Sequence, residues 1–268
     1  MTTRLAVCGA AGRMGKAIIE VVNDTQGIQL TTAIEHTKYP RLGQDSGELA
    51  GIEKNNVPIV ADISSVLDNF DVVIDFTQPQ ATVSNIEHCK KAGKAMVIGT
   101  TGLDEREQAV IKSASEAIGI IFAPNMSIGI NLCFKLTELA AGIIGENADI
   151  EIIEAHHRMK KDAPSGTAVH LGEIVANKLG RDLKQCAVYG RQGITAERDK
   201  RTIGFETIRA GDIVGEHTVM FAAEGERVEI THKASSRKTF ATGAVRAASW
   251  IMEQGVGLYD MQDVLGLR

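Results

Sequence analysis

The chain has 268 residues, of which 44% are hydrophobic, 24% charged and 4% aromatic, and its formal net charge is −5. This length supports one large domain or two ordinary domains with complete hydrophobic cores. The negative charge and the scarcity of aromatic residues argue against nucleic acid or an anionic membrane as a partner, and no apolar run approaches the roughly 20 residues that span a bilayer.

The first half of the sequence alternates short apolar runs with amphipathic stretches, which is typical of a parallel α/β sheet. Right-handed crossovers between such strands predict a doubly wound, Rossmann-like sheet. Gly93 follows the second expected helix and is a candidate C-cap. The expected strands are residues 4–8, 29–34, 71–76, 95–99 and 118–123, and the expected helices are residues 13–23, 81–91 and 104–117.

The pattern changes after about residue 125, because few helices separate the later strands. Residues 227–231 alternate polar and apolar side chains, as in a sheet with one solvated face. We therefore expect a second, α+β domain with a mixed or antiparallel sheet. Its expected strands are residues 149–154, 204–209, 217–221 and 227–231, and the expected helices of this half are residues 127–144, 164–179 and 239–252.

A glycine-rich turn, Gly9-Ala10-Ala11-Gly12-Arg13-Met14-Gly15, joins the first expected strand to the first helix. Glycine lets the backbone approach a pyrophosphate, which then lies on the helix N-terminus. The spacing is GxxGxxG rather than GxGxxG, but the strand–turn–helix context is the one that dinucleotide binding requires. Glu35 ends the second expected strand, where its carboxylate can bind the ribose hydroxyls of adenosine.

The preference between NADH and NADPH stays open, because His36 and Lys38 near Glu35 lack the planar fork of arginine that best suits a 2′-phosphate. Two further loops follow expected strand ends, on the side where open α/β sheets bind ligands. We expect them to contact the nicotinamide half of the cofactor, although each is also compatible with a plain turn. They are Gly99-Thr100-Thr101-Gly102 and Ala123-Pro124-Asn125-Met126.

The histidines His156 and His157 follow an expected strand, with Lys160 close behind them. Imidazoles exchange protons near neutral pH. Adjacent residues of an extended chain point in opposite directions, so we expect one histidine to face the reacting atoms and the other to bind or support. A zinc site is disfavoured, because diverging histidines lack a cysteine or carboxylate at helical spacing to complete the ligand set. No metal is expected.

The next helix begins near Ser165, Gly166 and Thr167, and its first N–H groups form a site for a carboxylate or phosphate. Ser165 or Thr167 can add a hydroxyl, and Gly166 lets a ligand approach the backbone. A solvated, charged loop that caps a helix is the alternative interpretation. His217 and His232 lie in strand patterns that are more typical of core or surface residues.

The four cysteines are widely spaced and form no CxxC pair. This spacing favours reduced, buried thiols, and with an N-terminus that enters a strand directly it predicts a cytoplasmic protein.

These motifs resemble the 4-hydroxy-tetrahydrodipicolinate (dihydrodipicolinate) reductase family, NAD(P)H-dependent enzymes of diaminopimelate and lysine synthesis. The resemblance extends over essentially the whole chain and is most specific at residues 154–157 and 160–168. Residues 9–15, 99–101, 209–217 and 231–237 also look like the family. One difference stands at His36, where many relatives have an arginine that meets the NADPH 2′-phosphate.

The resemblance implies a role for each part of the chain. His156 is the expected proton donor and Lys160 a second one, while His157, Ser165, Gly166 and Thr167 bind the carboxylates of a small dicarboxylate substrate. It further implies a homotetramer built through the second sheet, and a last helix that returns to the first domain. The implied domains are residues 1–126 with 238–268 for the dinucleotide, and residues 127–237 for substrate and oligomerisation.

The resulting hypothesis is hydride transfer to ring C4 and proton donation at C3 by His156 and Lys160, with loss of the hydroxyl as water. Two alternatives remain. Another oxidoreductase, such as an aldehyde dehydrogenase, needs a reactive cysteine. A non-catalytic dinucleotide sensor keeps the glycine turn but has no use for His156 and Lys160.

Overall fold

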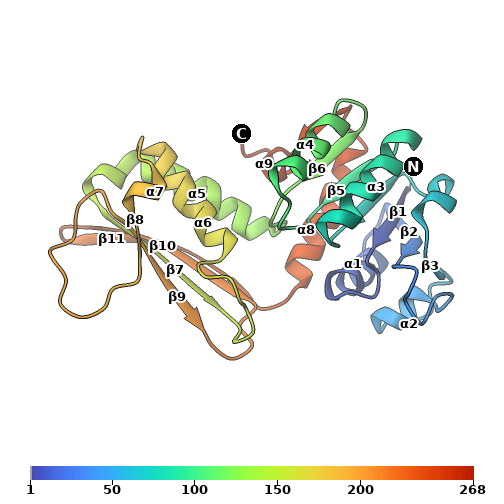
Figure 1. Cartoon of the computed structure of the whole chain (residues 1–268), viewed down its shortest axis with the longest axis horizontal. Helices are drawn as coiled ribbons and strands as arrows, with labels where there is room; N and C mark the ends of the chain where they lie inside the picture. Colours follow the sequence, from blue (N-terminus) through green and yellow to red (C-terminus); the bar gives the residue numbers. More distant parts are fainter. Residues whose placement is uncertain (1) are drawn as a thin grey trace. The chain divides into compact units, whose positions relative to one another are not determined.

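The computed structural model describes residues 2–268. The chain divides into two compact units, Met1–Ile128 with Arg237–Arg268, and Gly129–Ser236. The first unit therefore contains both ends of the chain, and the second is a continuous segment between them (Figure 1). The boundaries expected from the sequence differ from these by at most two residues.

The first unit contains a seven-stranded sheet in which every pairing is parallel. The strand order β12-β6-β5-β4-β1-β2-β3 contains the Rossmann order, which confirms the predicted fold class of this unit. The two edge strands, β3 and β12, were not expected from the sequence. The strands are β1 (Thr3–Cys8), β2 (Ile28–Ile34), β3 (Ile59–Val60), β4 (Val72–Asp75), β5 (Ala95–Ile98), β6 (Gly119–Phe122) and β12 (Gly257–Tyr259).

Helices cover both faces of this sheet, because alternate residues of each strand belong to different cores. In β1, Leu5 and Val7 pack in the core that includes α1 and α8, whereas Ala6 and Cys8 pack in the core that includes α3 and α4. Gly93 ends α3 in the left-handed conformation, as expected for a C-cap. The helices are α1 (Arg13–Asn23), α2 (Ser46–Ala50), α3 (Pro79–Ala92), α4 (Glu105–Ala114), α8 (Lys238–Ile251) and α9 (Met261–Leu265), with 3₁₀ turns at Ile63–Ser65 and Leu67–Asn69.

The second unit is a five-stranded mixed sheet of order β11-β10-β7-β9-β8, which confirms the predicted α+β character. β7 runs parallel to β9 and antiparallel to β10. The strands are β7 (Asp149–His156), β8 (Ala187–Tyr189), β9 (Ile203–Arg209), β10 (Gly215–Ala223) and β11 (Glu226–Ala234), and the helices are α5 (Ile128–Ile144), α6 (Gly166–Lys178) and α7 (Leu183–Cys186), with a 3₁₀ turn at Gly145–Asn147.

The core of the second unit lies between one face of this sheet and the helices α5 and α6. Ile150 and Ile152 of β7 and Phe221 of β10 are buried there. Because side chains alternate along a strand, Glu154 and His156 continue the same face of β7. The apolar core thus leads directly into a polar cluster at the carboxyl end of β7.

By length and composition, the helical segment Ile128–Asn147 is able to cross a membrane, with a mean hydropathy of 1.4. This differs from the expectation that no apolar run approaches that length. The core helix of a water-soluble protein passes the same test, and Ile130, Phe134 and Ala141 of this segment are buried in the core of the second unit. Other apolar side chains of the segment, including Leu139 and Ile143, are exposed.

Candidate active site

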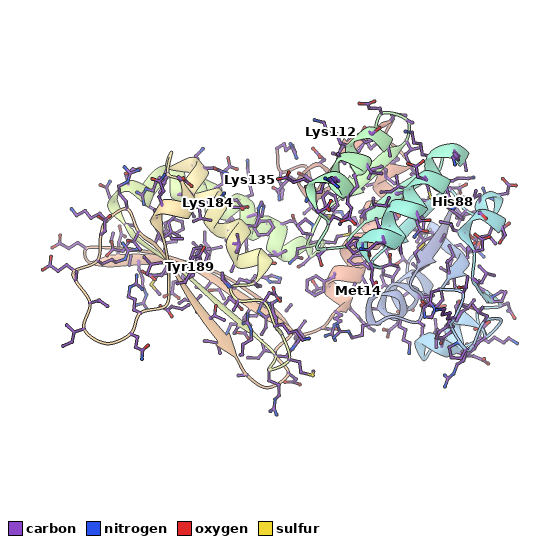
Figure 2. The ribbon with its side chains drawn as sticks, viewed as in Figure 1. Met14, His88, Lys112, Lys135, Lys184 and Tyr189 are labelled. Atoms are coloured by element: carbon purple, nitrogen blue, oxygen red, sulfur yellow. The ribbon has the colours of Figure 1, made fainter. Side chains whose placement is uncertain are left out.

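The glycine-rich turn after β1 has the backbone geometry of an anion site. Gly9 has a φ of +70°, and a Cβ at Gly15 would lie 2.2 Å from the Gly9 carbonyl oxygen, so only glycine fits there. Gly12 precedes α1 without a side-chain cap, and the first turn of α1 carries no acidic residue. The first N–H groups of α1, near Met14 (Figure 2), are therefore available to an anion.

Glu35 lies against this turn, at the end of β2. The Ala11 N–H donates a hydrogen bond to its Oε2 and the His36 N–H donates one to its Oε1, each at 3.0 Å. These two bonds orient the carboxylate beside the glycine turn. The His36 ring is exposed, and its Nδ1 accepts a hydrogen bond from the Lys38 N–H at 3.1 Å.

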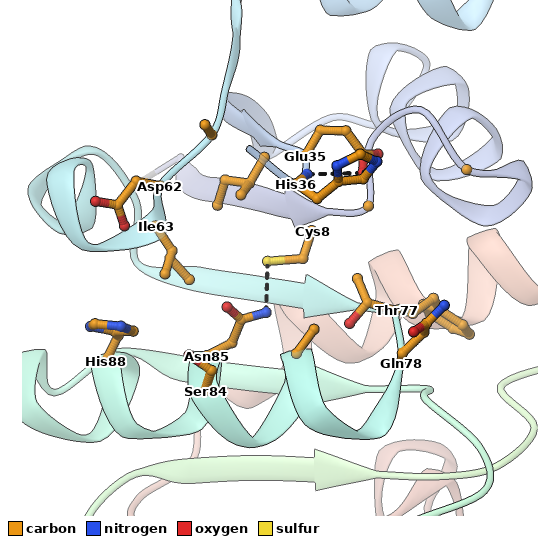
Figure 3. Close-up of a pocket in the computed structure, with 16 residues that line it drawn as sticks. Cys8, Glu35, His36, Asp62, Ile63, Thr77, Gln78, Ser84, Asn85 and His88 are labelled. Carbon is orange, nitrogen blue, oxygen red and sulfur yellow. Dashed lines mark hydrogen bonds and ion pairs between the residues drawn. The ribbon is translucent and has the colours of Figure 1, made fainter. Parts of the chain in front are cut away.

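A cavity of about 610 Å³ opens beside Gly9, Gly12, Glu35 and His36. Figure 3 shows Glu35 and His36 on one side of it and Asn85 and His88 of α3 on another. The residues of α3 and of the segment after β4 that line this cavity were not expected from the sequence. The lining residues that sequence analysis missed include Asp62, Ile63, Thr77, Gln78, Ala81, Ser84, Asn85 and His88.

The loop after β5 is held from below by a buried polar network. Thr100 is buried, and its hydroxyl lies 2.8 Å from the Thr82 hydroxyl and accepts a hydrogen bond from the Thr77 N–H at 3.1 Å. A Cβ at Gly99 would lie 2.2 Å from the Phe76 ring. The Thr100 side chain therefore supports the loop from its buried side. The parts of this loop that can contact a ligand are its backbone and the exposed Thr101.

The loop after β6 has mixed surroundings. Pro124 is exposed, and the Asn125 Oδ1 accepts a hydrogen bond from the Ser127 N–H at 3.0 Å. Met126 is fully buried in the first core, and its carbonyl oxygen lies where a Cβ at Gly243 would be. The Met126 side chain therefore packs in the core, and its expected contact with the cofactor stays a prediction.

In the second unit, His156 is bonded to a buried carboxylate. The distance from His156 Nδ1 to Glu154 Oε2 is 2.6 Å, and the Glu154 side chain is 1% exposed. Arg209 of β9 donates from Nη1 to Oε2 and from Nη2 to Oε1, both at 2.8 Å. The Ser165 N–H donates a further bond to Oε1 at 3.0 Å. Sequence analysis assigned no separate role to Glu154 or Arg209.

Ser165 caps α6 and contacts a second histidine. Its hydroxyl accepts a hydrogen bond from the Ala168 N–H at 3.2 Å and lies 2.9 Å from His217 Nε2. The rings of His217 and His156 meet edge to face, with centroids 5.1 Å apart. Sequence analysis interpreted His217 as an ordinary core or surface residue, but the pairing of β10 with β7 places it opposite Glu154.

The remaining predicted residues lie in the loop between β7 and α6 or at the start of α6. Lys160 Nζ donates to both carboxylate oxygens of Asp162, at 2.9 and 2.8 Å. His157 donates its N–H to the Ile213 carbonyl at 2.7 Å, and within residues 2–268 its buried Nδ1 has no hydrogen-bond partner. A Cβ at Gly166 would meet nothing within 4 Å, so the start of α6 is open.

Burial and charge set the protonation states of this cluster. Burial lowers the pKa of His156 below its usual range, although Glu154 opposes this shift. Burial alone would raise the pKa of Glu154, but its bonds with Arg209 and His156 outweigh that effect and the net pKa is lowered. Burial lowers the pKa of His217 to about 3. Near neutral pH the cluster therefore holds a carboxylate, a guanidinium and two neutral imidazoles.

Comparison with known proteins agrees with this arrangement. Residues 3–126 match the family model described as dihydrodipicolinate reductase, N-terminus, and residues 129–265 match its C-terminus counterpart. The 4-hydroxy-tetrahydrodipicolinate reductase of Methylococcus capsulatus is 58% identical over all 268 residues of both chains. That of Hahella chejuensis is 57% identical over 266 residues, which is 99% of this chain and 100% of the relative.

A solved structure of a dipicolinate-bound dihydrodipicolinate reductase from Paenisporosarcina sp. TG-14 has a similar fold. It is 26% identical in sequence, with a TM-score of 0.78 over 98% of this chain and 99% of that chain.

We predict that Ala81→Trp weakens dinucleotide binding by more than about tenfold, because an indole on α3 would fill the cavity beside Glu35. Isothermal titration calorimetry with NADH measures the dissociation constant. Glu87→Trp is the matched control, since Glu87 is exposed on α3 and does not line the cavity. Equal affinity in both variants would place the dinucleotide elsewhere.

We also predict a pH effect on stability from His217. The pKa of His217 is about 3 in the folded protein, below the ~6.5 of an unfolded histidine. The contribution of His217 to stability is therefore complete above pH ~6.5 and is lost as the pH falls from there toward 3. Within this window one such group contributes a slope of about 1.4 kcal/mol per pH unit. His217→Gln should remove up to that slope from the free energy of unfolding measured with urea between about pH 6 and 4.

Thr218→Val serves as the control for that measurement, because it changes the neighbouring residue of β10 without removing a titratable group. Its unfolding free energy should run parallel to that of the wild type across the same pH range. If the His217→Gln curve is also parallel, His217 does not remain neutral in the folded protein.

Proposed function

The chain belongs to the dihydrodipicolinate reductase family, and from this premise we propose how its residues carry out the NAD(P)H-dependent reduction of 4-hydroxy-tetrahydrodipicolinate. The overall change eliminates the C4 hydroxyl together with a C3 hydrogen as water, and it adds a hydride at C4 and a proton at C3. The observation that carries the proposal is the His156–Glu154 pair beside the open helix start at Gly166.

The first unit fits a nicotinamide dinucleotide. The glycine turn, whose Gly15 position admits no Cβ, receives the pyrophosphate on the start of α1, and Glu35 binds the adenosine ribose. When bound, the reduced nicotinamide supplies the hydride. Of the described residues, no lysine or arginine lines the cavity, so His36 and His88 are the groups there that would meet a 2′-phosphate.

In the second unit His156 supplies the proton that the ring takes up at C3. Its pKa is lowered in the free protein, so the imidazole is largely neutral near pH 7. Two substrate carboxylates placed nearby favour the imidazolium, because an opposite charge within about 4–6 Å stabilises the protonated form. Substrate binding would therefore charge the acid that the reaction needs. Lys160, held by Asp162, is the second donor.

The substrate carboxylates are bound by His157 and by the start of α6. The Nδ1 of His157, which has no hydrogen-bond partner among the described residues, and the open space at Gly166 support this assignment. The N–H groups of Gly166 and Thr167 lie in the first turn of α6, where a helix attracts anions. Ser165 contributes through its position as the cap, because its hydroxyl is bonded to Ala168 and His217. The relative from Paenisporosarcina, which binds dipicolinate, supports a dicarboxylate ligand.

An oxidoreductase that works through a cysteine nucleophile is disfavoured, since only a thiolate attacks readily. Burial raises the pKa of Cys89 to about 12 and raises the pKa of Cys8 and Cys133 as well. Burial also raises the pKa of Cys186. None of the four thiols is therefore activated.

We further propose a cytoplasmic homotetramer assembled through the second sheet. The supporting observation is the sheet face opposite α5 and α6, which no helix of the described residues covers and which carries Ile208, 48% exposed, together with Ile153 and Met220. Light scattering of the purified protein would overturn this if it gave the mass of a monomer.

The activity test follows NADH and NADPH oxidation in parallel, with the substrate generated in situ from pyruvate and aspartate-semialdehyde. We expect fast oxidation that needs both precursors, and the ratio of the two rates measures the cofactor preference. His156→Gln should lower kcat by about 10²–10⁴-fold, which is the usual contribution of a positioned acid. The dissociation constant for NADH should not change, because the substituted side chain belongs to the second unit.

His170→Gln, at an exposed position of α6, is the control and should retain full activity. Wild-type turnover in His156→Gln would remove His156 from the mechanism. Absence of oxidation with either cofactor, in folded protein that binds NADH, would instead favour the sensor.

A further inference from the structure

We propose that Glu154 is a positioning residue for His156, which fixes the imidazole so that proton transfer runs through Nε2. The inference rests on the proposed role of His156 as the proton donor. It adds a residue that does not contact the reacting atoms but determines which nitrogen of the acid meets them.

The hydrogen bond with Glu154 occupies one of the two nitrogens of the His156 ring. His156 Nδ1 lies 2.6 Å from Glu154 Oε2, and both side chains belong to the same face of β7. A carboxylate accepts hydrogen bonds, so in the neutral imidazole the proton stands on Nδ1. Nε2 is then the nitrogen that receives a proton and returns it to the substrate.

The carboxylate is itself held from two further directions. Arg209 binds both of its oxygens from β9, and the Ser165 N–H binds Oε1 from the cap of α6. A bidentate arginine fixes the plane of a carboxylate as well as its charge. Glu154 therefore presents Oε2 to His156 in one orientation, and it ties the proton donor to the start of the substrate-binding helix.

The opposite side of the imidazole faces a residue that has no side chain. A Cβ at Gly215, the first residue of β10, would lie 3.1 Å from His156 Nε2. Gly215 does not have a positive φ, so backbone conformation does not demand glycine there. The missing side chain instead leaves room at the nitrogen that Glu154 does not occupy.

The decisive variant is Glu154→Gln, which keeps the shape of the side chain and removes its charge. A glutamine amide no longer favours the imidazolium, so the pKa of His156 should fall. Because proton donation requires the protonated ring, the loss of kcat with rising pH should then occur at a lower pH than in the wild type. We expect kcat at neutral pH to fall by about tenfold or more, with the dissociation constant for NADH unchanged. The other charged or titratable groups around His156, which the variant retains, are Arg209 on β9, His217 on β10, and Lys160 and Asp162 in the loop after β7.

Glu151→Gln provides a matched control. Glu151 lies on the same strand and is likewise paired with arginine, in its case with both Arg191 and Arg198, but it has no contact with His156 among the described residues. A purely structural ion pair would lower stability in either variant and leave the pH profile of kcat in place. The proposal is overturned if Glu154→Gln keeps the wild-type pH midpoint, or if Glu151→Gln shifts it equally.

A second measurement observes the protonation state of His156 in the wild-type protein. In wild-type protein with ¹⁵N-labelled histidine, the His156 signal, assigned with His156→Gln, should show a protonated Nδ1 and an unprotonated Nε2 once the ring is neutral. The opposite tautomer would overturn the positioning role. Because this experiment needs no turnover, it separates failure of the proposal about Glu154 from failure of the proposed reductase activity.

Discussion

A buried carboxylate has to be compensated by charge and by hydrogen bonds, and this requirement organises the second unit around Glu154. Its partners come from β9, from the cap of α6 and from the end of β7 itself. Compensating the charge of this one side chain therefore brings together the strand that carries His156, the proposed proton donor, and a helix start of the kind that attracts anions. The apolar core below, from Ile150 to Phe221, gives this cluster a rigid base.

The first unit meets its ligand in a different way. Its anion site consists of backbone N–H groups at the start of α1, and what it requires is close approach of main chains at Gly9 and Gly15. The buried network of Thr82 and Thr100 supports the neighbouring loop without presenting a charge. The candidate site of the first unit thus relies on backbone shape and that of the second on compensated side-chain charge, in keeping with the proposal that the first binds a cofactor and the second protonates a substrate.

Local patterns predicted all of the described strands except β3, β8 and β12, because each predicted strand has its own short stretch of alternating or apolar residues. The glycine-rich turn and the His156 segment were proposed as sites from equally short stretches. The short edge strands β3 and β12 lacked enough residues for a periodic signal. Glu154 lies far in sequence from Arg209 and His217, and the sequence around these residues did not indicate their roles. Only the pairing of β7 with β9 and β10 brings them together. Alternation along β7 did offer one signal, since Glu154 stands two residues before His156 on the same face. The α3 residues that line the cavity follow β4 without a glycine-rich or charged motif, so no local signal in the sequence indicated them.

The division of the chain also determines the order in which its parts can be completed during synthesis. All five strands of the second unit precede α8, so that unit can close while the C-terminal residues are still inside the ribosome. The first core, by contrast, includes Ala244 and Val245 of α8 together with Ile18 and Ile19 of α1, so it is complete only once α8 has been made. The part of the α1 surface that packs with α8, although made early, therefore stays uncovered by that helix until α8 has been synthesised.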